Sequence, residues 1–172
     1  MEKVIRTVCF TGHRDIAPAD AVRLPGQLER VVRELYARGA REFRAGGALG
    51  FDMVAALKVL TMRDELPDIR LVLILPCRDQ TAKWNEPSIR TYRYIEQNAD
   101  EVRYLFDRYI DGCMLERDRC LVNGSDVCVA YCAKNTGGTA YTFTYSLKNG
   151  LEVINLFDRL RAEDRKGRSG MV

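Results

Sequence analysis

Three glycine-bearing turns carry the residues of this sequence best suited to hold a phosphate. They are Thr11-Gly12-His13-Arg14, Gly46-Gly47-Ala48-Leu49-Gly50-Phe51-Asp52 and Gly137-Gly138-Thr139. Glycine allows a positive φ angle and lets a ligand approach the backbone closely. Backbone N–H groups at the start of the helix that follows such a turn, together with the helix dipole, favour an anion. The turns therefore predict a binding site for a phosphate-bearing ligand.

The side chains in these turns add groups that such a ligand would use. Arg14 carries a planar guanidinium that suits bidentate contact with a phosphate, and Thr11 offers a hydroxyl. His13 is the one histidine of the chain, and a structural role explains it more simply than catalysis does. Asp52 would lie in the first turn of a helix, where it either stabilises the helix N-terminus or accepts a hydrogen bond from a ribose hydroxyl or a base. Both roles of Asp52 stay open.

Short apolar segments alternate with longer amphipathic segments, which is typical of βαβ units around a parallel sheet. The predicted strands cover residues 4–10, 42–45, 69–75, 101–105, 127–131 and 153–157. Helices are predicted over residues 24–38, 51–65, 88–98 and 111–122, and over a stretch ending near 149. The pattern predicts an α/β, Rossmann-like three-layer fold with a mostly parallel sheet flanked by helices. Each glycine turn follows a strand, so the three turns should meet at the carboxyl edge of the sheet, where such folds bind ligands.

The length of 172 residues fits one domain with a core large enough to need no disulfide or metal. We expect residues 1–158 to form that domain. The segment 159–172 is strongly basic, with a cluster from Arg159 to Arg168. Chain ends of this composition seldom pack, so a flexible C-terminal tail is expected there.

Composition argues against several classes of protein. The 27 basic and 24 acidic residues leave a net charge of +3, which is too small to indicate a nucleic-acid binder. No apolar run approaches the roughly 18–20 residues that cross a bilayer, and the first residues lack the pattern of a signal peptide. We therefore expect a cytoplasmic protein without a membrane partner.

The six cysteines do not have the spacing of a metal site. There is no Cys-x-x-Cys pair, and one histidine is available to complete a zinc site. Several of the cysteines lie in apolar stretches, where a reduced cysteine acts as a small hydrophobic residue. We expect structural thiols, no metal and no required cofactor.

Four segments make the chain similar to a known superfamily by their order and spacing. They are the three glycine turns, the last one extended through Ala140-Tyr141-Thr142, and Lys83-Trp84 in a polar loop. From about Thr7 to Phe157 the sequence resembles the SLOG superfamily, and within it the YpsA-like group of small bacterial proteins. That resemblance implies a Rossmann-like sheet with a pocket for a nucleotide or a nucleotide derivative. The YpsA-like group has been linked to cell division and growth control in Gram-positive bacteria.

Two related branches imply other activities. LOG phosphoribohydrolases release a base from a nucleoside monophosphate, and DprA/Smf proteins bind single-stranded DNA. LOG enzymes carry Pro-Gly-Gly-x-Gly-Thr-x-x-Glu, whose glutamate acts on the ribose, and this chain has Thr142 in its place. Asp52 and Asp118 remain as candidates for an anion that stabilises an oxocarbenium-like state. Whether the protein is an enzyme stays open.

Arg117 belongs to a second segment of the resemblance. Residues 117–123 read Arg-Asp-Arg-Cys-Leu-Val-Asn, where YpsA-like proteins carry an Arg-Asn-x-x-Met-Val-Asp-like helix. The resemblance implies that Arg117 binds the ligand. Asp118 and Asn123 have exchanged acid and amide, and these two side chains would face either each other or the ligand. The alternative is that these side chains are charges on a helix surface.

Three functions follow as hypotheses. The leading one is a protein that binds or senses a nucleotide or nucleotide derivative through the three turns and Arg117. The first alternative is a phosphoribohydrolase-like enzyme acting on nucleoside 5′-monophosphates. The second is a single-stranded DNA-binding protein of the DprA type, with a stacking and basic surface from Trp84, Tyr92, Tyr94, Arg90 and Arg93. A homo-oligomer is also expected, because small Rossmann-like domains often pair through helices.

Overall fold

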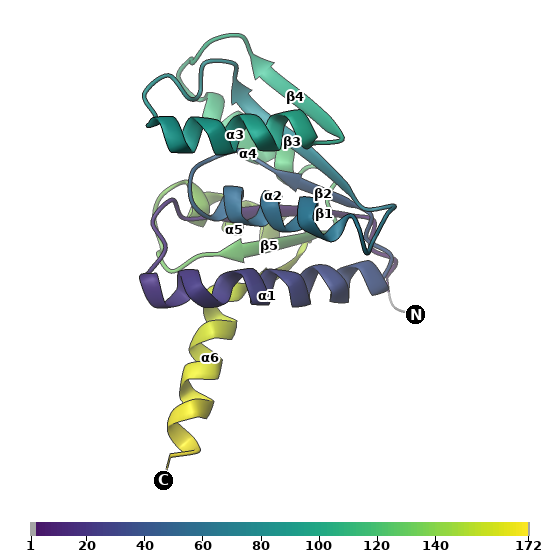
Figure 1. Cartoon of the computed structure of the whole chain (residues 1–172), viewed down its shortest axis with the longest axis vertical. Helices are drawn as coiled ribbons and strands as arrows, with labels where there is room; N and C mark the ends of the chain where they lie inside the picture. The colour runs from purple at the N-terminus through teal and green to yellow at the C-terminus, as the bar shows by residue number, and fades with distance from the viewer. Residues whose placement is uncertain (1–2, 172) are drawn as a thin grey trace.

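The computed structural model describes residues 3–171, and their strands form one fully parallel, six-stranded sheet (Figure 1). The strands are β1 (Thr7–Gly12), β2 (Glu42–Ala45), β3 (Arg70–Cys77), β4 (Glu101–Phe106), β5 (Val127–Tyr131) and β6 (Glu152–Asn155). Their spatial order is β4-β3-β2-β1-β5-β6, and every neighbouring pair is parallel.

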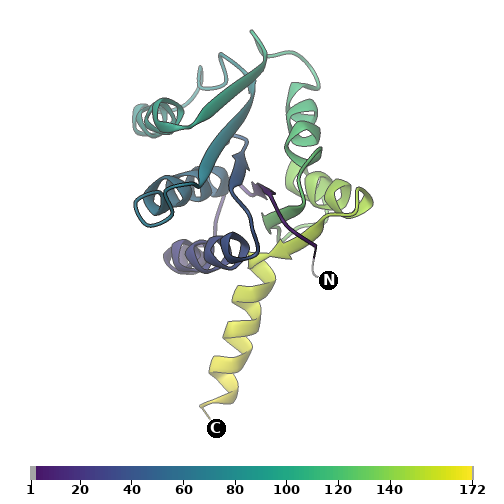
Figure 2. The same ribbon diagram turned by 90° about the vertical axis from the view of Figure 1, so that its right-hand side faces the viewer.

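Helices cover both faces of the sheet and make three layers (Figure 2). They are α1 (Pro18–Ala37), α2 (Phe51–Met62), α3 (Glu86–Asn98), α4 (Cys113–Val122), α5 (Gly138–Lys148) and α6 (Leu156–Ser169). The first three pack side by side on one face, while α4 and α5 lie on the other. The predicted α/β, Rossmann-like three-layer fold is confirmed. No helix in residues 3–171 combines the length and the apolar character that crossing a bilayer requires.

The strand order reverses at β1. The strands β2, β3 and β4 extend the sheet to one side of β1, and β5 and β6 extend it to the other. The register places Gly12, the last residue of β1, beside Tyr131, the last residue of β5. In open α/β sheets the crevice at such a reversal is where ligands bind. The topology therefore directs attention to the turns that follow β1 and β5.

Buried aromatic rings fix the base of this crevice. Phe10 on β1 and Phe51 at the start of α2 are both fully buried, with ring centroids 6.3 Å apart. The Phe51 ring also stacks on Tyr131 at the end of β5, at 6.2 Å. Gly12 lies against the same ring, because a Cβ atom there would come within 2.3 Å of Phe51. The turn after β1 thus requires glycine to pack on α2.

Residues 159–169, which belong to the expected C-terminal tail, are helical in the structure, because α6 continues to Ser169. The predicted last strand is also too long, since β6 ends at Asn155 and the helix begins at Leu156. The physical reason is a short apolar face, in which Leu156 and Leu160 are fully buried. Residue 172 lies outside the described residues.

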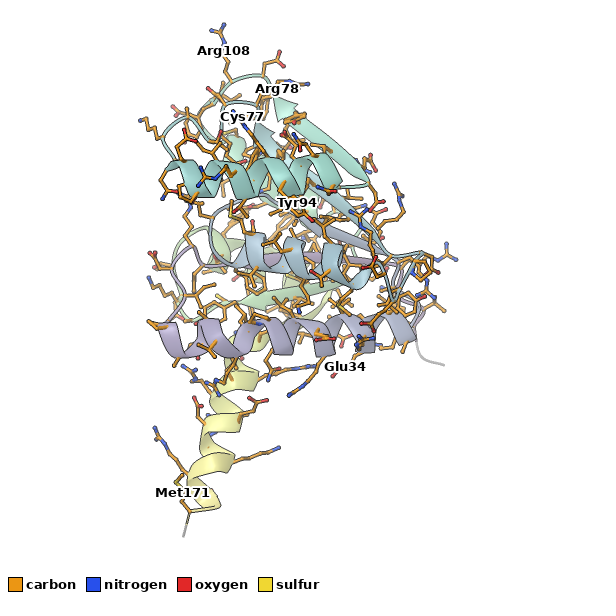
Figure 3. All side chains as sticks on the ribbon, viewed as in Figure 1. Glu34, Cys77, Arg78, Tyr94, Arg108 and Met171 are labelled. Atoms are coloured by element: carbon orange, nitrogen blue, oxygen red, sulfur yellow. The ribbon has the colours of Figure 1, made fainter. Side chains whose placement is uncertain are left out.

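Ion pairs hold the first half of α6 against α1. Asp20 of α1 is buried, pairs with Arg161 and accepts a hydrogen bond of 2.6 Å from the Tyr131 hydroxyl. Arg23 of α1 contacts Asp164 at 2.9 Å. The second half of α6 extends away from the sheet, with Met171 at its far end (Figure 3). The helix is therefore anchored at its start and exposed at its end.

We expect Leu160→Ala to lower the free energy of unfolding by about 2–4 kcal/mol, since it removes a fully buried side chain. Urea denaturation followed by circular dichroism measures this loss. Arg165→Ala, at an exposed position of the same helix, should change the stability by less than about 0.5 kcal/mol. Equal, small effects of both substitutions would mean that this segment does not pack.

Candidate functional site

A pocket of about 380 Å³ opens at the carboxyl ends of β1 and β5, and we call it the switch-point pocket. It brings together most of the predicted site residues: Thr11, Gly12, His13, Arg14, Ala48, Asp52, Arg117, Asp118, Gly137, Gly138 and Thr139. Three predicted glycines, Gly46, Gly47 and Gly50, are absent from its lining. Four further lining residues were not among those predicted: Met114, Leu121, Lys134 and Thr136.

Sequence signals existed for some of the missed residues. Lys134 and Thr136 lie between β5 and Gly137, directly before the third glycine turn. Met114 lies three residues before Arg117, so one face of a helix carries both side chains. Leu121 reads as an ordinary core residue in the sequence, and its place in the lining depends on how α4 packs.

The turn between β5 and α5 leaves a helix N-terminus open to the switch-point pocket. Gly137 has a φ of 95°, a conformation that favours glycine, and no side chain caps the helix. Both Gly137 and Gly138 are exposed. The first backbone N–H groups of a helix have no partner inside it, so this end of α5 suits an anion.

His13 connects the turns rather than standing free. Its Nε2 accepts a hydrogen bond of 2.8 Å from the Ala133 N–H, and its carbonyl accepts one of 3.1 Å from Phe51. Burial, with the nearby Lys134 charge, lowers the pKa of His13 below its usual value. The imidazole is therefore neutral at pH 7 and holds the turns after β1 and β5 together.

Two cations at the rim are available to a ligand. Arg14 and Lys134 both line the switch-point pocket and are exposed. Neither forms an ion pair with another residue of the range 3–171. Arg117, by contrast, is buried, and its guanidinium donates to the Gly46 carbonyl and to Asp118 Oδ1, the latter at 2.8 Å. Arg117 therefore supports the floor of the pocket, while Arg14 and Lys134 face solvent.

Two carboxylates share the floor with Arg117. Asp52 is 5% exposed, and its Oδ2 accepts a hydrogen bond of 3.3 Å from the Ala48 N–H. Burial raises the pKa of Asp52 to about 6, against the opposing effect of the Arg117 charge. Burial also raises the pKa of Asp118, again opposed by Arg117. The floor thus contains two acids that hold protons more readily than surface carboxylates do.

Thr142, which stands where LOG enzymes carry their glutamate, lies inside the fold. Thr142 is fully buried on α5, and its hydroxyl donates to the Gly138 carbonyl at 2.9 Å. It is not part of the lining of the switch-point pocket. The Thr142 hydroxyl therefore bonds within α5.

The glycines of the second turn shape the site from behind. A Cβ atom at Gly46 would come within 2.6 Å of the Arg117 guanidinium, so glycine leaves room for that side chain. Gly50 has a φ of 80°, and a Cβ there would lie 2.2 Å from the Arg14 carbonyl. Gly46 thus allows the second turn to pack against Arg117, and Gly50 allows it to pack against the turn after β1.

One member of the expected stacking surface for DNA is not available to a ligand. Tyr92 is buried at 6% exposure and packs edge-on against Trp84, with ring centroids 5.5 Å apart. Tyr94 is exposed on α3 and is labelled in Figure 3. Tyr92 therefore serves the core rather than a bound base.

We expect Asp52→Asn to stabilise the protein by about 1–3 kcal/mol at pH 8. The folded protein binds a proton at Asp52 up to about pH 6, whereas the unfolded chain releases it near 3.8. Ionisation therefore costs the wild type stability as the pH rises through this window, and asparagine avoids that cost. The gain should vanish as the pH falls below 3.8. Denaturation at several pH values tests this, and a gain independent of pH would contradict it.

Comparisons with known proteins agree with the fold and the motifs. The model of the YspA SLOG family matches residues 20–154. A UPF0398 protein of Brevibacillus brevis is 32% identical over 98 residues, which cover 55% of this chain and 52% of that protein. A UPF0398 protein of Staphylococcus haemolyticus is 41% identical over 104 residues, covering 56% and 55%. The chain thus spans about half the length of these relatives.

A solved structure shows the same fold. DNA processing protein A from Helicobacter pylori, described for its single-stranded DNA binding mode, is similar with a TM-score of 0.61 and 21% identity. The similarity covers 87% of this chain and 64% of that one. The resemblance inferred from the glycine turns is confirmed, because the family match includes well over half of the residues. The chain belongs to the YspA SLOG family.

Proposed function

We propose that this protein binds a nucleotide or a nucleotide derivative and holds its phosphate in the switch-point pocket. One observation carries the proposal, which is the uncapped N-terminus of α5 lying open in a pocket at the reversal of strand order. The exposed Arg14 and Lys134 at the rim support it, because both can neutralise phosphate charge. The ligand would then act as a signal that the protein senses.

Calorimetric titration with mononucleotides, dinucleotides and ADP-ribose derivatives tests the proposal. We expect at least one of them to bind, and inorganic pyrophosphate to compete for the same pocket. Absence of binding by every member of the panel would overturn it. Arg14→Ala should weaken binding, while Arg108→Ala, an exposed arginine outside the pocket lining, serves as its control (Figure 3).

A phosphoribohydrolase-like reaction is the second candidate, favoured by the two buried acids at the floor of the pocket. Asp52 and Asp118 lie beside the open end of α5, where a nucleoside 5′-monophosphate would place its phosphate. The reaction predicts release of free base by the purified protein and its loss in Asp52→Asn. A protein that binds nucleotide without releasing base would exclude the reaction and leave the binding function intact.

Single-stranded DNA binding is the third candidate, favoured by the fold shared with DNA processing protein A. Such binding would use Arg14 and Lys134 along the phosphate chain and would weaken steeply with salt. A mobility shift with an oligonucleotide at low salt tests it. Absence of a shift there removes this candidate.

We further propose that the protein is cytoplasmic, forms homo-oligomers and acts in bacterial growth or division. The six unpaired cysteines within residues 3–171 support a reducing compartment. Analytical ultracentrifugation with and without ligand measures the oligomeric state, and a monomer under both conditions would contradict that part.

A further inference from the structure

A second cavity adjoins the switch-point pocket. It has a volume of about 670 Å³, and we call it the tryptophan pocket because Trp84 lines it. Arg14 and Met114 line both pockets, so the two cavities meet at these side chains. A ligand with its phosphate in the first pocket would therefore extend past Arg14 into the second.

The walls of the tryptophan pocket suit a flat ring. Trp84 and Tyr109 supply aromatic surface, and Leu49 and Met114 supply apolar surface. Planar rings stack on such side chains, and stacking of a nucleobase contributes about 1–3 kcal/mol in single-stranded nucleic-acid complexes. These four side chains therefore favour a nucleobase over a sugar or a chain of phosphates.

Gln80 is a polar residue in the wall of this pocket, and the protein itself holds its amide. Its Nε2 donates to the Gly47 carbonyl at 3.2 Å. Its Oε1 is buried, so this oxygen is not presented to a ligand in the pocket. The Gln80 amide therefore ties the loop after β3 to the second glycine turn.

The pocket is built before any ligand enters. Trp84 is held edge-on by Tyr92 at 5.5 Å, and its backbone N–H donates to the Thr81 carbonyl at 3.0 Å. The Tyr109 N–H donates to Asp79 Oδ1 at 2.9 Å, which ties the loop after β4 to the loop after β3. Preformed walls reduce the entropy lost on binding.

We propose that the tryptophan pocket holds the base of the ligand whose phosphate occupies the switch-point pocket. The inference rests on the proposed function and deepens it. It names the ligand class as nucleoside phosphates. Trp84 stacks on the base, and Arg14, which lines both pockets, contacts the phosphate.

The single tryptophan of the chain makes this testable by fluorescence. AMP and ADP should quench Trp84 emission on binding, whereas inorganic pyrophosphate should bind without quenching. Ribose 5-phosphate, which lacks a base, should bind about tenfold more weakly than AMP and leave the emission unchanged. Binding of AMP and ADP without any change in emission would overturn the inference and leave the proposed function standing.

Two variants separate the stacking contact from the fold. Trp84→Leu should reduce AMP affinity to that of ribose 5-phosphate and leave pyrophosphate affinity unchanged. Gln97→Leu, at an exposed position of α3, should change neither affinity. If Trp84→Leu leaves AMP affinity unchanged, the proposed contact is wrong. If neither nucleotides nor pyrophosphate bind the wild type, both this inference and the proposed function fail.

Discussion

Gly138→Asp should weaken nucleotide and pyrophosphate binding by about 100- to 1000-fold. Gly138 is the first residue of α5, is exposed and lines the switch-point pocket. A carboxylate there would face the bound phosphate, and two like charges about 4 Å apart near a protein surface repel by about 4 kcal/mol. A factor of ten in affinity corresponds to about 1.4 kcal/mol, which gives the expected range. Isothermal titration calorimetry measures the loss.

The same substitution is expected to keep the protein folded. An acidic residue in the first turn of a helix stabilises the helix by about 0.3–1 kcal/mol. The substitution should therefore not lower the melting temperature by weakening α5. Gly138→Ala is the matched control, because a Cβ at this position lies 3.8 Å from Asp118 Oδ2, an ordinary contact. Alanine should keep the affinity within about threefold. Normal binding by Gly138→Asp would mean that the phosphate does not lie at α5.

The sequence predicts the sheet well because the central strands bury both faces. Every residue of β3 from Leu71 to Cys77 is buried, and so is all of β5, so their apolar runs stand out without any alternation. The order of the strands could not be predicted, because it depends on contacts between residues far apart in the chain. The helix α6 was missed for another reason: two leucines carry its packing within a strongly charged segment.

The three turns could be located from the sequence, but the different tasks of their glycines could not. Gly137 provides the positive φ at the open end of α5, whereas Gly46 leaves space for the Arg117 side chain. Both read as glycine after a strand. Arg117 itself was assigned to the ligand through family resemblance, and only the packing of α4 against the second turn reveals that its guanidinium is already bonded to the protein.

Arg117 is therefore the residue on which the charge balance of the floor depends. It is the only cation within hydrogen-bonding distance of Asp118 among residues 3–171, and its charge also opposes the rise of the Asp52 pKa. One guanidinium thus serves two buried carboxylates and one backbone carbonyl. Removing it leaves buried anions without compensation, which is among the costliest changes a fold can undergo.

Arg117→Met should lower the free energy of unfolding by about 3–5 kcal/mol at pH 7.5. The loss should shrink as the pH falls towards 5, because without the Arg117 charge the pKa values of Asp52 and Asp118 rise further and the folded variant takes up protons there. Urea denaturation at the two pH values measures the difference. Arg119→Met, which breaks an exposed pair with Glu116 on the same helix, should cost far less stability at either pH.

A double substitution keeps this prediction testable if Arg117→Met does not fold. Arg117→Met combined with Asp118→Asn removes the guanidinium and its carboxylate partner together, so it should recover part of the lost stability at pH 7.5 and little at pH 5. The recovery arises because the buried charge, rather than the contact itself, makes the single substitution costly. A loss that is equal at both pH values and unrelieved by Asp118→Asn would assign the role of Arg117 to its bond with the Gly46 carbonyl and its packing against Gly46.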